Sequence, residues 1–242
     1  MRLACTALGA LLLALLPHTS ISQGLVSQHQ RCISLSALAD FEPCWTALVG
    51  DPSAMQPLVG FISGVLMSAN SDDGAAALAA ALRVLDAALE KHPGNANLWF
   101  TRANALRAAG RLSEALQSYE RAVGALPVHV DALHSAAALL AESGPRPRDA
   151  RLAARLLATA VRVQPSAARL LASAGIILSR LGRDSDAIHL LRRSASLAPR
   201  WALPHAARSD ILERLGNLHQ AEAALLHALS IQQSLNDDAA AG

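Results

Sequence analysis

Side chains that could do chemistry are scattered along this 242-residue chain instead of being grouped at informative spacings. The nine histidines include no pair four residues apart and no HExxH motif, so they offer no metal-binding helix. Gly-rich phosphate loops and the GxSxG motif of hydrolases are also absent. We therefore expect no catalytic residues, no metal site and no cofactor, and interpret the histidines as ordinary surface or core residues.

The cysteines are the exception, and their number depends on whether the first 22 residues are cleaved off. Cys5 would be lost with that segment, whereas Cys32 and Cys44 would remain in the mature chain. Two cysteines in an exported chain most simply form a disulfide, which would stabilise the fold by roughly 3 kcal/mol through loop closure. Two separate buried thiols are the alternative.

Residues 1–22 have the features of a secretory signal peptide. Arg2 precedes an apolar run of 14 residues from Leu3 to Leu16, which is shorter than the roughly 20 residues needed to span a bilayer. Ser20 and Ser22 suit a cleavage site ahead of Gln23. An uncleaved anchor or a buried first helix is the alternative. The segment predicts a periplasmic or secreted protein without an integral membrane span.

The elements that carry these residues are predicted to be helices. Apolar residues make up 52% of the chain and aromatic residues only 3%, with Ala and Leu dominating. Ala and Leu favour helices, whereas strands favour aromatic and β-branched residues, so the composition predicts an all-α protein.

Glycines and prolines recur with a period near 34 residues. The glycines are spaced 34, 38 and 34 residues apart, at Gly110, Gly144, Gly182 and Gly216. The prolines Pro93, Pro127, Pro165 and Pro199 alternate with them at spacings of 34, 38 and 34. A glycine can close one helix in a left-handed cap and a proline can stop the next, so each unit predicts a pair of helices.

A second pattern places small residues around a larger one between each glycine and the following proline. Spacings of four and three put the three residues of each set on one helix face. The sets are Ala81/Leu85/Ala88, Ala115/Tyr119/Ala122, Ala153/Leu157/Ala160, Ala187/Leu191/Ser194 and Ala221/Leu225/Ala228. Neither helix of a pair can bury its face alone, so the units must stack into an α-solenoid of antiparallel helix pairs.

This pattern resembles the tetratricopeptide repeat family. The first full unit places eight residues on the family motif: Trp99, Ala103, Leu106, Gly110, Ala115, Tyr119, Ala122 and Pro127. The resemblance implies four full units from about residue 96 and a degenerate unit before them, which gives a repeat domain at 75–233. Residues 23–74 are predicted to form a separate helical segment, with short helices at about 25–39 and 55–69, and residues 234–242 a disordered tail.

In the family, the first helix of each unit lines a concave groove that binds a partner protein or peptide. The resemblance implies that the groove displays Asn97, Phe100, Asn104, Arg107, His134, Arg169, Ser173, Arg180, Asp210 and Arg214. Some relatives clamp a terminal carboxylate with Lys and Asn. Here Asn104 matches that clamp but Phe100 stands at a Lys position, so the clamp is incomplete.

Charge is distributed unevenly. Residues 144–200 hold 11 Arg and three Asp, which is a net charge of +8. Residues 23–143 carry a net −4 and residues 201–242 a net −3. A basic centre favours an acidic partner, and leaves open contact with anionic lipid headgroups or association between copies of the chain. Arginines that simply solvate exposed helix faces are the alternative.

These observations predict a non-enzymatic interaction scaffold or assembly factor of the bacterial periplasm or cell envelope. Two alternatives stay open: a factor that holds apocytochromes during assembly of c-type cytochromes, and a self-associating structural protein. Export and the scarcity of aromatic residues for base stacking disfavour nucleic acid as a partner.

Overall fold

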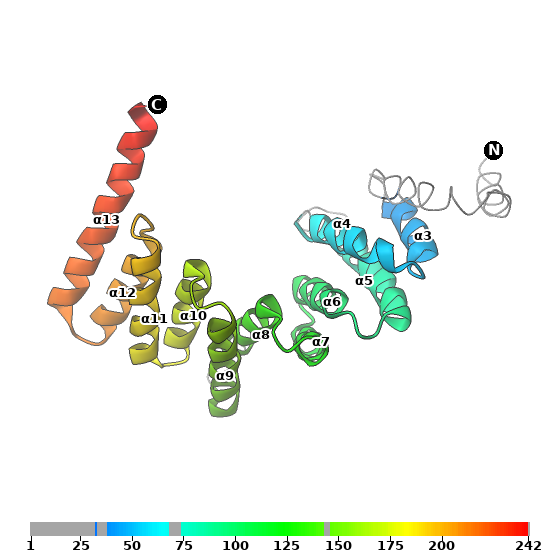
Figure 1. Cartoon of the computed structure of the whole chain (residues 1–242), viewed down its shortest axis with the longest axis horizontal. Coiled ribbons are helices and arrows are strands. Elements are labelled where there is room, and N and C mark those ends of the chain that lie inside the picture. Colours follow the sequence, from blue (N-terminus) through cyan, green and yellow to red (C-terminus); the bar gives the residue numbers. More distant parts are fainter. Residues whose placement is uncertain (1–31, 33–37, 68–73, 143–145, 242) are drawn as a thin grey trace. The chain divides into compact units, whose positions relative to one another are not determined.

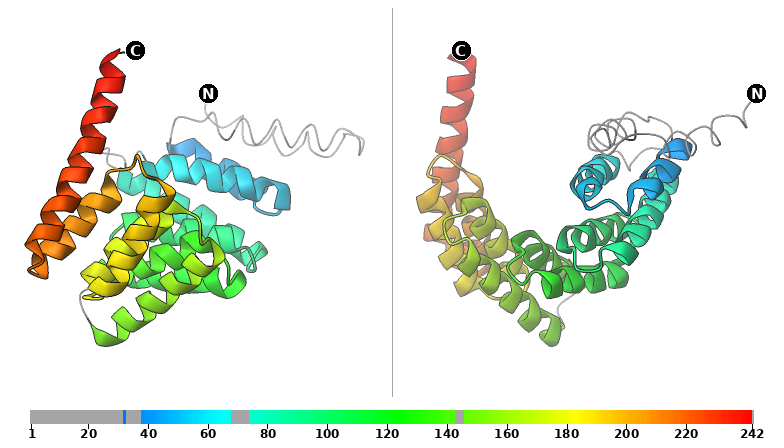
Figure 2. Two further views of the ribbon diagram at one scale, coloured as in Figure 1. Left: turned by 60° about the vertical axis from the view of Figure 1, so that its left-hand side comes forward. Right: turned by 45° about the vertical axis from the view of Figure 1, so that its right-hand side comes forward.

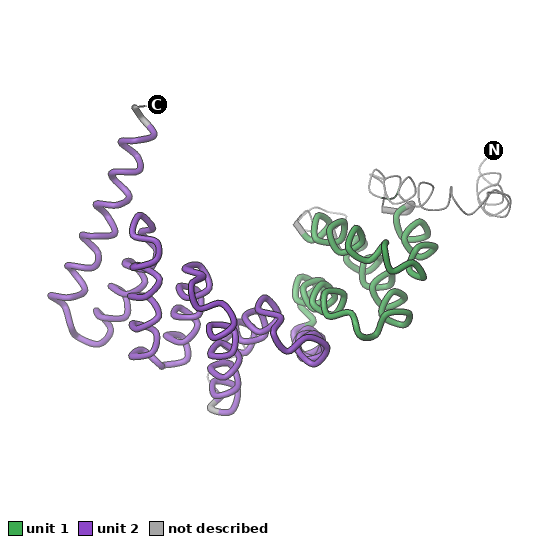
Figure 3. Tube along the Cα trace, viewed as in Figure 1, with its two compact units in different colours: residues 1–111 green, residues 112–242 purple. Residues whose placement is uncertain are grey.

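A computed structural model describes residues 32, 38–67, 74–142 and 146–241 (Figure 1). Every regular element in these ranges is a helix, which confirms the all-α prediction. The chain divides into two compact units, with the boundary between Arg111 and Leu112 (Figure 3). The boundary falls inside the first predicted full repeat, so each unit is described by itself. The predicted domain boundary at residue 74 stays a prediction.

The described part of unit 1 contains four helices and one 3₁₀ turn. In chain order they are α3 (Leu38–Leu48), η2 (Pro52–Ala54), α4 (Met55–Met67), α5 (Gly74–Lys91) and α6 (Ala96–Ala108). The helices predicted near 55–69 and 75–92 are present. The helix predicted at 25–39 falls almost entirely outside the described residues. The structure also has α3, which was not predicted and which holds Pro43 in its interior.

The core of unit 1 is built on aromatic residues from α3 and α4. The Trp45 side chain is fully buried, with its ring centroid 5.6 Å from that of Phe61, and Phe41 lies 5.3 Å from Phe61. At the surface, Arg83 of α5 binds both carboxylate oxygens of Glu42 of α3 at 2.6 Å. The Arg83 hydrogen bond holds the pKa of Glu42 below its ordinary value.

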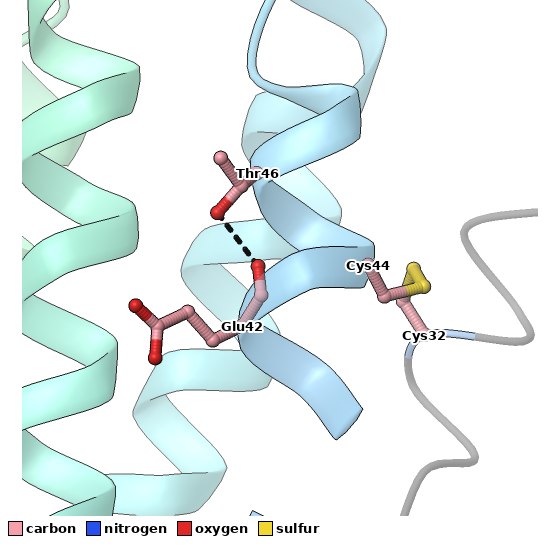
Figure 4. Close-up of a disulfide and its surroundings, with 4 residues drawn as sticks. All are labelled: Cys32, Glu42, Cys44 and Thr46. Atoms are coloured by element: carbon pink, nitrogen blue, oxygen red, sulfur yellow. Dashed lines mark hydrogen bonds between the residues drawn. A yellow bond between two sulfur atoms is a disulfide. The ribbon is translucent and has the colours of Figure 1, made fainter. Parts of the chain in front are cut away.

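A disulfide joins Cys32 to Cys44 of α3 (Figure 4). The two Cα atoms are 5.8 Å apart, within the range that a disulfide requires, and Cys32 is fully buried. One turn away, the Thr46 hydroxyl donates to the Glu42 carbonyl oxygen at 2.6 Å. The disulfide predicted from cysteine number is therefore confirmed.

Residues 112–142 and 146–241 of unit 2 form seven helices that pack as successive neighbours (Figures 1 and 2). They are α7 (Leu112–Ala125), α8 (Val130–Glu142), α9 (Pro147–Val163), α10 (Ala168–Arg180), α11 (Asp184–Leu197), α12 (Leu203–Arg214) and α13 (Leu218–Ala241). Within repeats, α8 packs on α9, α10 on α11 and α12 on α13. These are the stacked helix pairs that the period predicted.

The helix ends fall where the glycines and prolines predicted. Gly110, Gly182 and Gly216 have φ angles of +73°, +73° and +77°, a conformation that side chains with a Cβ rarely adopt. At Gly182, the amides of Gly182 and Arg183 donate to the Ser179 and Leu178 carbonyls at 2.9 Å and close α10. Gly144 lies outside the described residues. The helices α5, α7, α9 and α11 each end two residues before their proline.

The last helix corrects two expectations. The tail predicted to be disordered from residue 234 is helical as far as Ala241, because Ala and Leu continue the helix and Arg200 forms an ion pair with Asp238. Leu225 was expected to fill a core position, yet its side chain is 45% exposed. Of the α13 side chains that the structure describes, only Ala221, Ala224, Ala228 and Ile231 are buried.

Candidate functional site

The first helices of the repeats in unit 2, α8, α10 and α12, are adjacent to one another, with α10 in the middle. We call this the first-helix face. Six of the predicted groove residues belong to these helices: His134 on α8, Arg169, Ser173 and Arg180 on α10, and Asp210 and Arg214 on α12. The remaining four, Asn97, Phe100, Asn104 and Arg107, belong to α6 in unit 1.

A pocket of about 370 Å³ opens on the first-helix face between α10 and α12. Its apolar wall consists of Ile176, Leu203, Ala206, Ala207 and Ile211. Its polar edge consists of Ser179, Arg180, Asp210 and Arg214. Three of the predicted groove residues therefore converge on one cavity, although Arg180 and Asp210 are 30 positions apart in the sequence.

Arg214 is held in place by neighbouring polar groups. Its Nη2 atom donates to Asp184 Oδ1 at 2.8 Å and to Ser179 Oγ at 2.6 Å, and the Ser179 hydroxyl also lies 3.1 Å from Asp184 Oδ1. This network joins α10, α11 and α12 at the edge of the pocket. Much of the positive charge of Arg214 is therefore already neutralised by Asp184.

Arg180 and Asp210 differ from Arg214 in having no such partner. Both side chains are exposed, and neither forms an ion pair or a side-chain hydrogen bond with any described residue. Arg180 thus offers the pocket an uncompensated positive charge and Asp210 an uncompensated negative one. An extended peptide could satisfy both groups while its apolar side chain enters the cavity.

The other three predicted residues of unit 2 do not line this pocket. Arg169 is exposed at the start of α10. The Ser173 hydroxyl donates to the carbonyls of Arg169 and Leu170 in its own helix, both at 3.0 Å. His134 is half-buried on α8. The prediction that these residues bind a partner stays untested.

The four predicted residues of α6 share one helix whose start is well capped. The Asn95 side chain accepts from the amides of Asn97 and Leu98 at 3.1 and 3.2 Å. Asn97 and Arg107 are exposed, and Phe100 and Asn104 are half-buried. None of these four side chains lines the cavity of unit 1 that opens beside α5.

A second cavity of unit 2 was not predicted. It measures about 460 Å³ and opens between α9 and α11, the second helices of their repeats. Its floor is apolar, with Ala154, Leu157 and Leu190, and its rim carries Arg162, Arg183 and Arg193. The excess of arginine in residues 144–200 was its only signal in the sequence, because the rim comes from both helices.

The described residues contain no group of three or more His, Cys, Asp or Glu side chains placed to hold a metal ion. In the same ranges, no helix combines the length and the apolarity that a membrane span needs.

Comparison with protein families agrees with the repeat geometry. One tetratricopeptide repeat profile matches residues 66–129 and 146–200, and a second matches residues 205–235. The chain belongs to the tetratricopeptide repeat family. The profiles start earlier than the first full unit and include α5, the helix assigned above to a degenerate unit. A comparison with curated proteins found no match.

Solved tetratricopeptide repeat proteins share this fold at low sequence identity. MamA is 16% identical over 66% of this chain and 92% of its own length, with a TM-score of 0.60. Residues 41 to the end of MamA from Desulfovibrio magneticus RS-1 are 16% identical over 73% of this chain and 96% of that one, with a TM-score of 0.59. YrrB, described as a TPR protein with an unusual peptide-binding site, is 21% identical over 77% and 91%, with a TM-score of 0.59.

Proposed function

We propose that this protein is a non-enzymatic interaction module that holds a segment of a partner protein against the first-helix face of unit 2. The pocket between α10 and α12 carries the proposal. It combines an apolar wall with one exposed arginine, Arg180, that no residue of the described chain neutralises. Stacked repeats commonly bind extended segments on such surfaces.

The pocket indicates the chemistry of the bound segment. An apolar side chain would fill the cavity beside Ile176 and Leu203, and a carboxylate next to it would pair with Arg180. Arg214 contributes little additional charge because Asp184 already neutralises it. Asp210 would repel a second carboxylate and favour a basic or neutral residue. The preferred ligand is an extended peptide with one acidic residue beside an apolar one.

The cellular location that we propose is the bacterial periplasm or the extracellular space. Two observations support it: the signal-like composition of residues 1–22 and the disulfide between Cys32 and Cys44. Disulfides persist in oxidising compartments and are rare in the cytosol, so a bonded pair agrees with export. Exported partners are therefore the first to test.

The test uses an array of envelope-protein peptides probed with the wild type and two charge-reversal variants. Arg180→Glu should abolish capture of acidic–apolar peptides. Arg169→Glu is the matched control, because Arg169 is an exposed arginine of the same helix that does not line the pocket. If all three proteins capture the peptides equally and their helicity by circular dichroism is the same, the pocket does not bind the partner segment.

The two alternative functions remain distinct proposals. Self-association is supported by α13, whose exposed leucines include Leu218, Leu226 and Leu229 at 65%, 59% and 56% exposure. Light scattering at low and high salt would detect it. No structural feature favours an apocytochrome partner specifically, and CxxCH peptides on the same array would show whether they are selected.

A further inference from the structure

Two arginines occupy the same place in different repeats. Arg102 of α6 lies three residues after Trp99 and eight before the capping Gly110. Arg208 of α12 lies three residues after His205 and eight before the capping Gly216. The repeat therefore allows the surroundings of one arginine to be compared with those of the other.

In the first of these places, the arginine has a carboxylate partner. Arg102 Nε donates to Oδ1 of Asp86, on the preceding helix α5, at 2.6 Å, and only 20% of the Arg102 side chain is exposed. Asp86 directly follows Leu85, the large residue of its three-residue set. A partly buried arginine at this place is thus neutralised from the helix before it.

In the last repeat, the residue at the place of the carboxylate is another arginine, so it has the same charge as Arg208. The residue that follows Leu191, at the place of Asp86, is Arg192 of α11. Arg208 is half-buried, its Nε atom is buried without a hydrogen-bond partner, and neither arginine forms an ion pair with any described residue. Burial and the charge of Arg192 together lower the pKa of Arg208.

Two histidines complete the cluster. His205, at the place of Trp99, is only 8% exposed, and its Nδ1 atom is buried without a hydrogen-bond partner. Its ring centroid lies 4.3 Å from that of His227 on α13. Burial lowers the pKa of His205 most, and the charges of His227 and Arg208 lower it further. Cationic or protonatable groups from α11, α12 and α13 therefore meet with no acidic residue paired to them.

The cluster is separate from the peptide pocket. The pocket is lined by Ala206, Asp210 and Arg214, which are four residues apart on one side of α12. At about 100° per residue, His205 and Arg208 are turned to the other side of the helix. The inference from this cluster therefore does not rest on the proposed function of the pocket.

The geometry points to an anion site formed by Arg192, His205, Arg208 and His227, filled by a carboxylate of an acidic partner segment. Such a group would take the part that Asp86 plays for Arg102. It would offer acceptors to the buried Arg208 Nε and, when the tautomer or protonation allows, to His205 Nδ1. The planar carboxylate is favoured over other anions because it is the group that fits the equivalent place in the first repeat.

The decisive experiment is calorimetric titration of the full chain with a blocked hexaglutamate peptide at constant ionic strength. Arg192→Asp should restore the arrangement of Asp86 and Arg102, raise the melting temperature and weaken peptide binding by about tenfold or more. Arg193→Asp makes the same charge change one residue further along α11, where the side chain lines the other cavity, and should alter binding by no more than about twofold. Equal weakening by both variants would overturn the site.

Two further measurements cover other outcomes. Arg192→Ala adds no new ion pair, and it should also weaken binding if the site is correct, even if Arg192→Asp disturbs folding. Nitrogen NMR of the His205 ring should show its pKa rising when acetate is added to the wild type. If inorganic phosphate binds more tightly than acetate and is lost in Arg192→Asp, the carboxylate assignment is wrong and the ligand is a phosphate.

Discussion

Gly175 of α10 packs directly against Leu191 of α11. A Cβ atom built on Gly175 would lie 2.9 Å from Leu191 Cγ and 3.2 Å from the carbonyl oxygen of Ala187. The corresponding places in other repeats hold Ala103, Ala137 and Ser209, so this helix pair is packed more closely than its neighbours can be. The close approach explains a glycine in the middle of a helix, where it would otherwise be unfavourable.

Gly175→Ala should therefore destabilise unit 2 by about 1–3 kcal/mol, even though alanine has the higher helix propensity. Denaturant unfolding followed by circular dichroism measures the change. Gly124→Ala in α7 is the control, because nothing lies within 4 Å of a Cβ there, and it should be neutral or stabilising. If Gly175→Ala stabilises the protein as Gly124→Ala does, the packing argument is wrong.

Asp184→Ala should remove the carboxylate that neutralises Arg214. Because the two side chains are 22% and 55% exposed, the loss of stability should be about 0.5–1 kcal/mol. Asp186→Ala is the matched control, since Asp186 lies in the same first turn and pairs only with Arg183 at 2.5 Å, where both groups are about half exposed. Similar urea midpoints for the two variants would show that the hydrogen bonds with Ser179 add nothing to the stability of the protein.

Reduction of the disulfide should destabilise unit 1. Opening the loop between Cys32 and Cys44 should lower its free energy of unfolding by about 3 kcal/mol, because the unfolded chain regains conformational freedom. The Trp45 fluorescence change during unfolding, measured with and without reductant in a Trp99→Phe/Trp201→Phe background, gives the difference. In a Cys32→Ser/Cys44→Ser variant the reductant should not lower the free energy of unfolding any further. If it lowers it by the same amount there, opening the disulfide is not the cause of the lost stability.

Acid should weaken the packing of α12. The pKa of His205 lies below its ordinary value of 6.5 in the folded protein, so the unfolded chain binds its proton first as the pH falls. Stability from this source is complete above about pH 7, and is lost as the pH falls from 6.5 through the lowered pKa of the folded state.

The groups that face His205 are His227 of α13 and Arg208 of its own helix, with Arg192 of α11 next to Arg208. His205→Phe should flatten the dependence of melting temperature on pH between 5 and 7, a range set by the ordinary histidine pKa. His189→Phe on the exposed side of α11 should keep the wild-type slope. An unchanged slope in His205→Phe would show that another group controls the acid response.

Much of the fold was predictable because its signals are local. The left-handed backbone at Gly110, Gly182 and Gly216 and the proline after each of α5, α7, α9 and α11 act on their own turns of chain. Their spacing therefore already defines the helix pairs. Small residues such as Ala153 and Ala160 repeat on one helix face and must pack against a neighbour. The helix α3 was not predicted; it holds Pro43 in its interior, and Trp45 of α3 packs on Phe61 of α4.

The candidate site was only partly predictable, because its charges are balanced across helices. Position in the repeat placed both Arg180 and Arg214 on the first-helix face, and they were equivalent in the sequence. The structure distinguishes them, because Asp184 of α11 neutralises Arg214 and not Arg180, and Ser179 of α10 accepts a hydrogen bond from the same Arg214 Nη2. The basic rim between α9 and α11 was hidden for the same reason.

The sequence by itself determined the helix pairs and their period, since both depend on residue type and spacing along the chain, and it favoured the pairing of Cys32 with Cys44. Only the tertiary structure decided which polar groups are satisfied. Arg102 and Arg208 have the same place in the repeat, yet one faces Asp86 and the other Arg192. Whether a buried charge is neutralised depends on the neighbouring helix, and folding selects that neighbour.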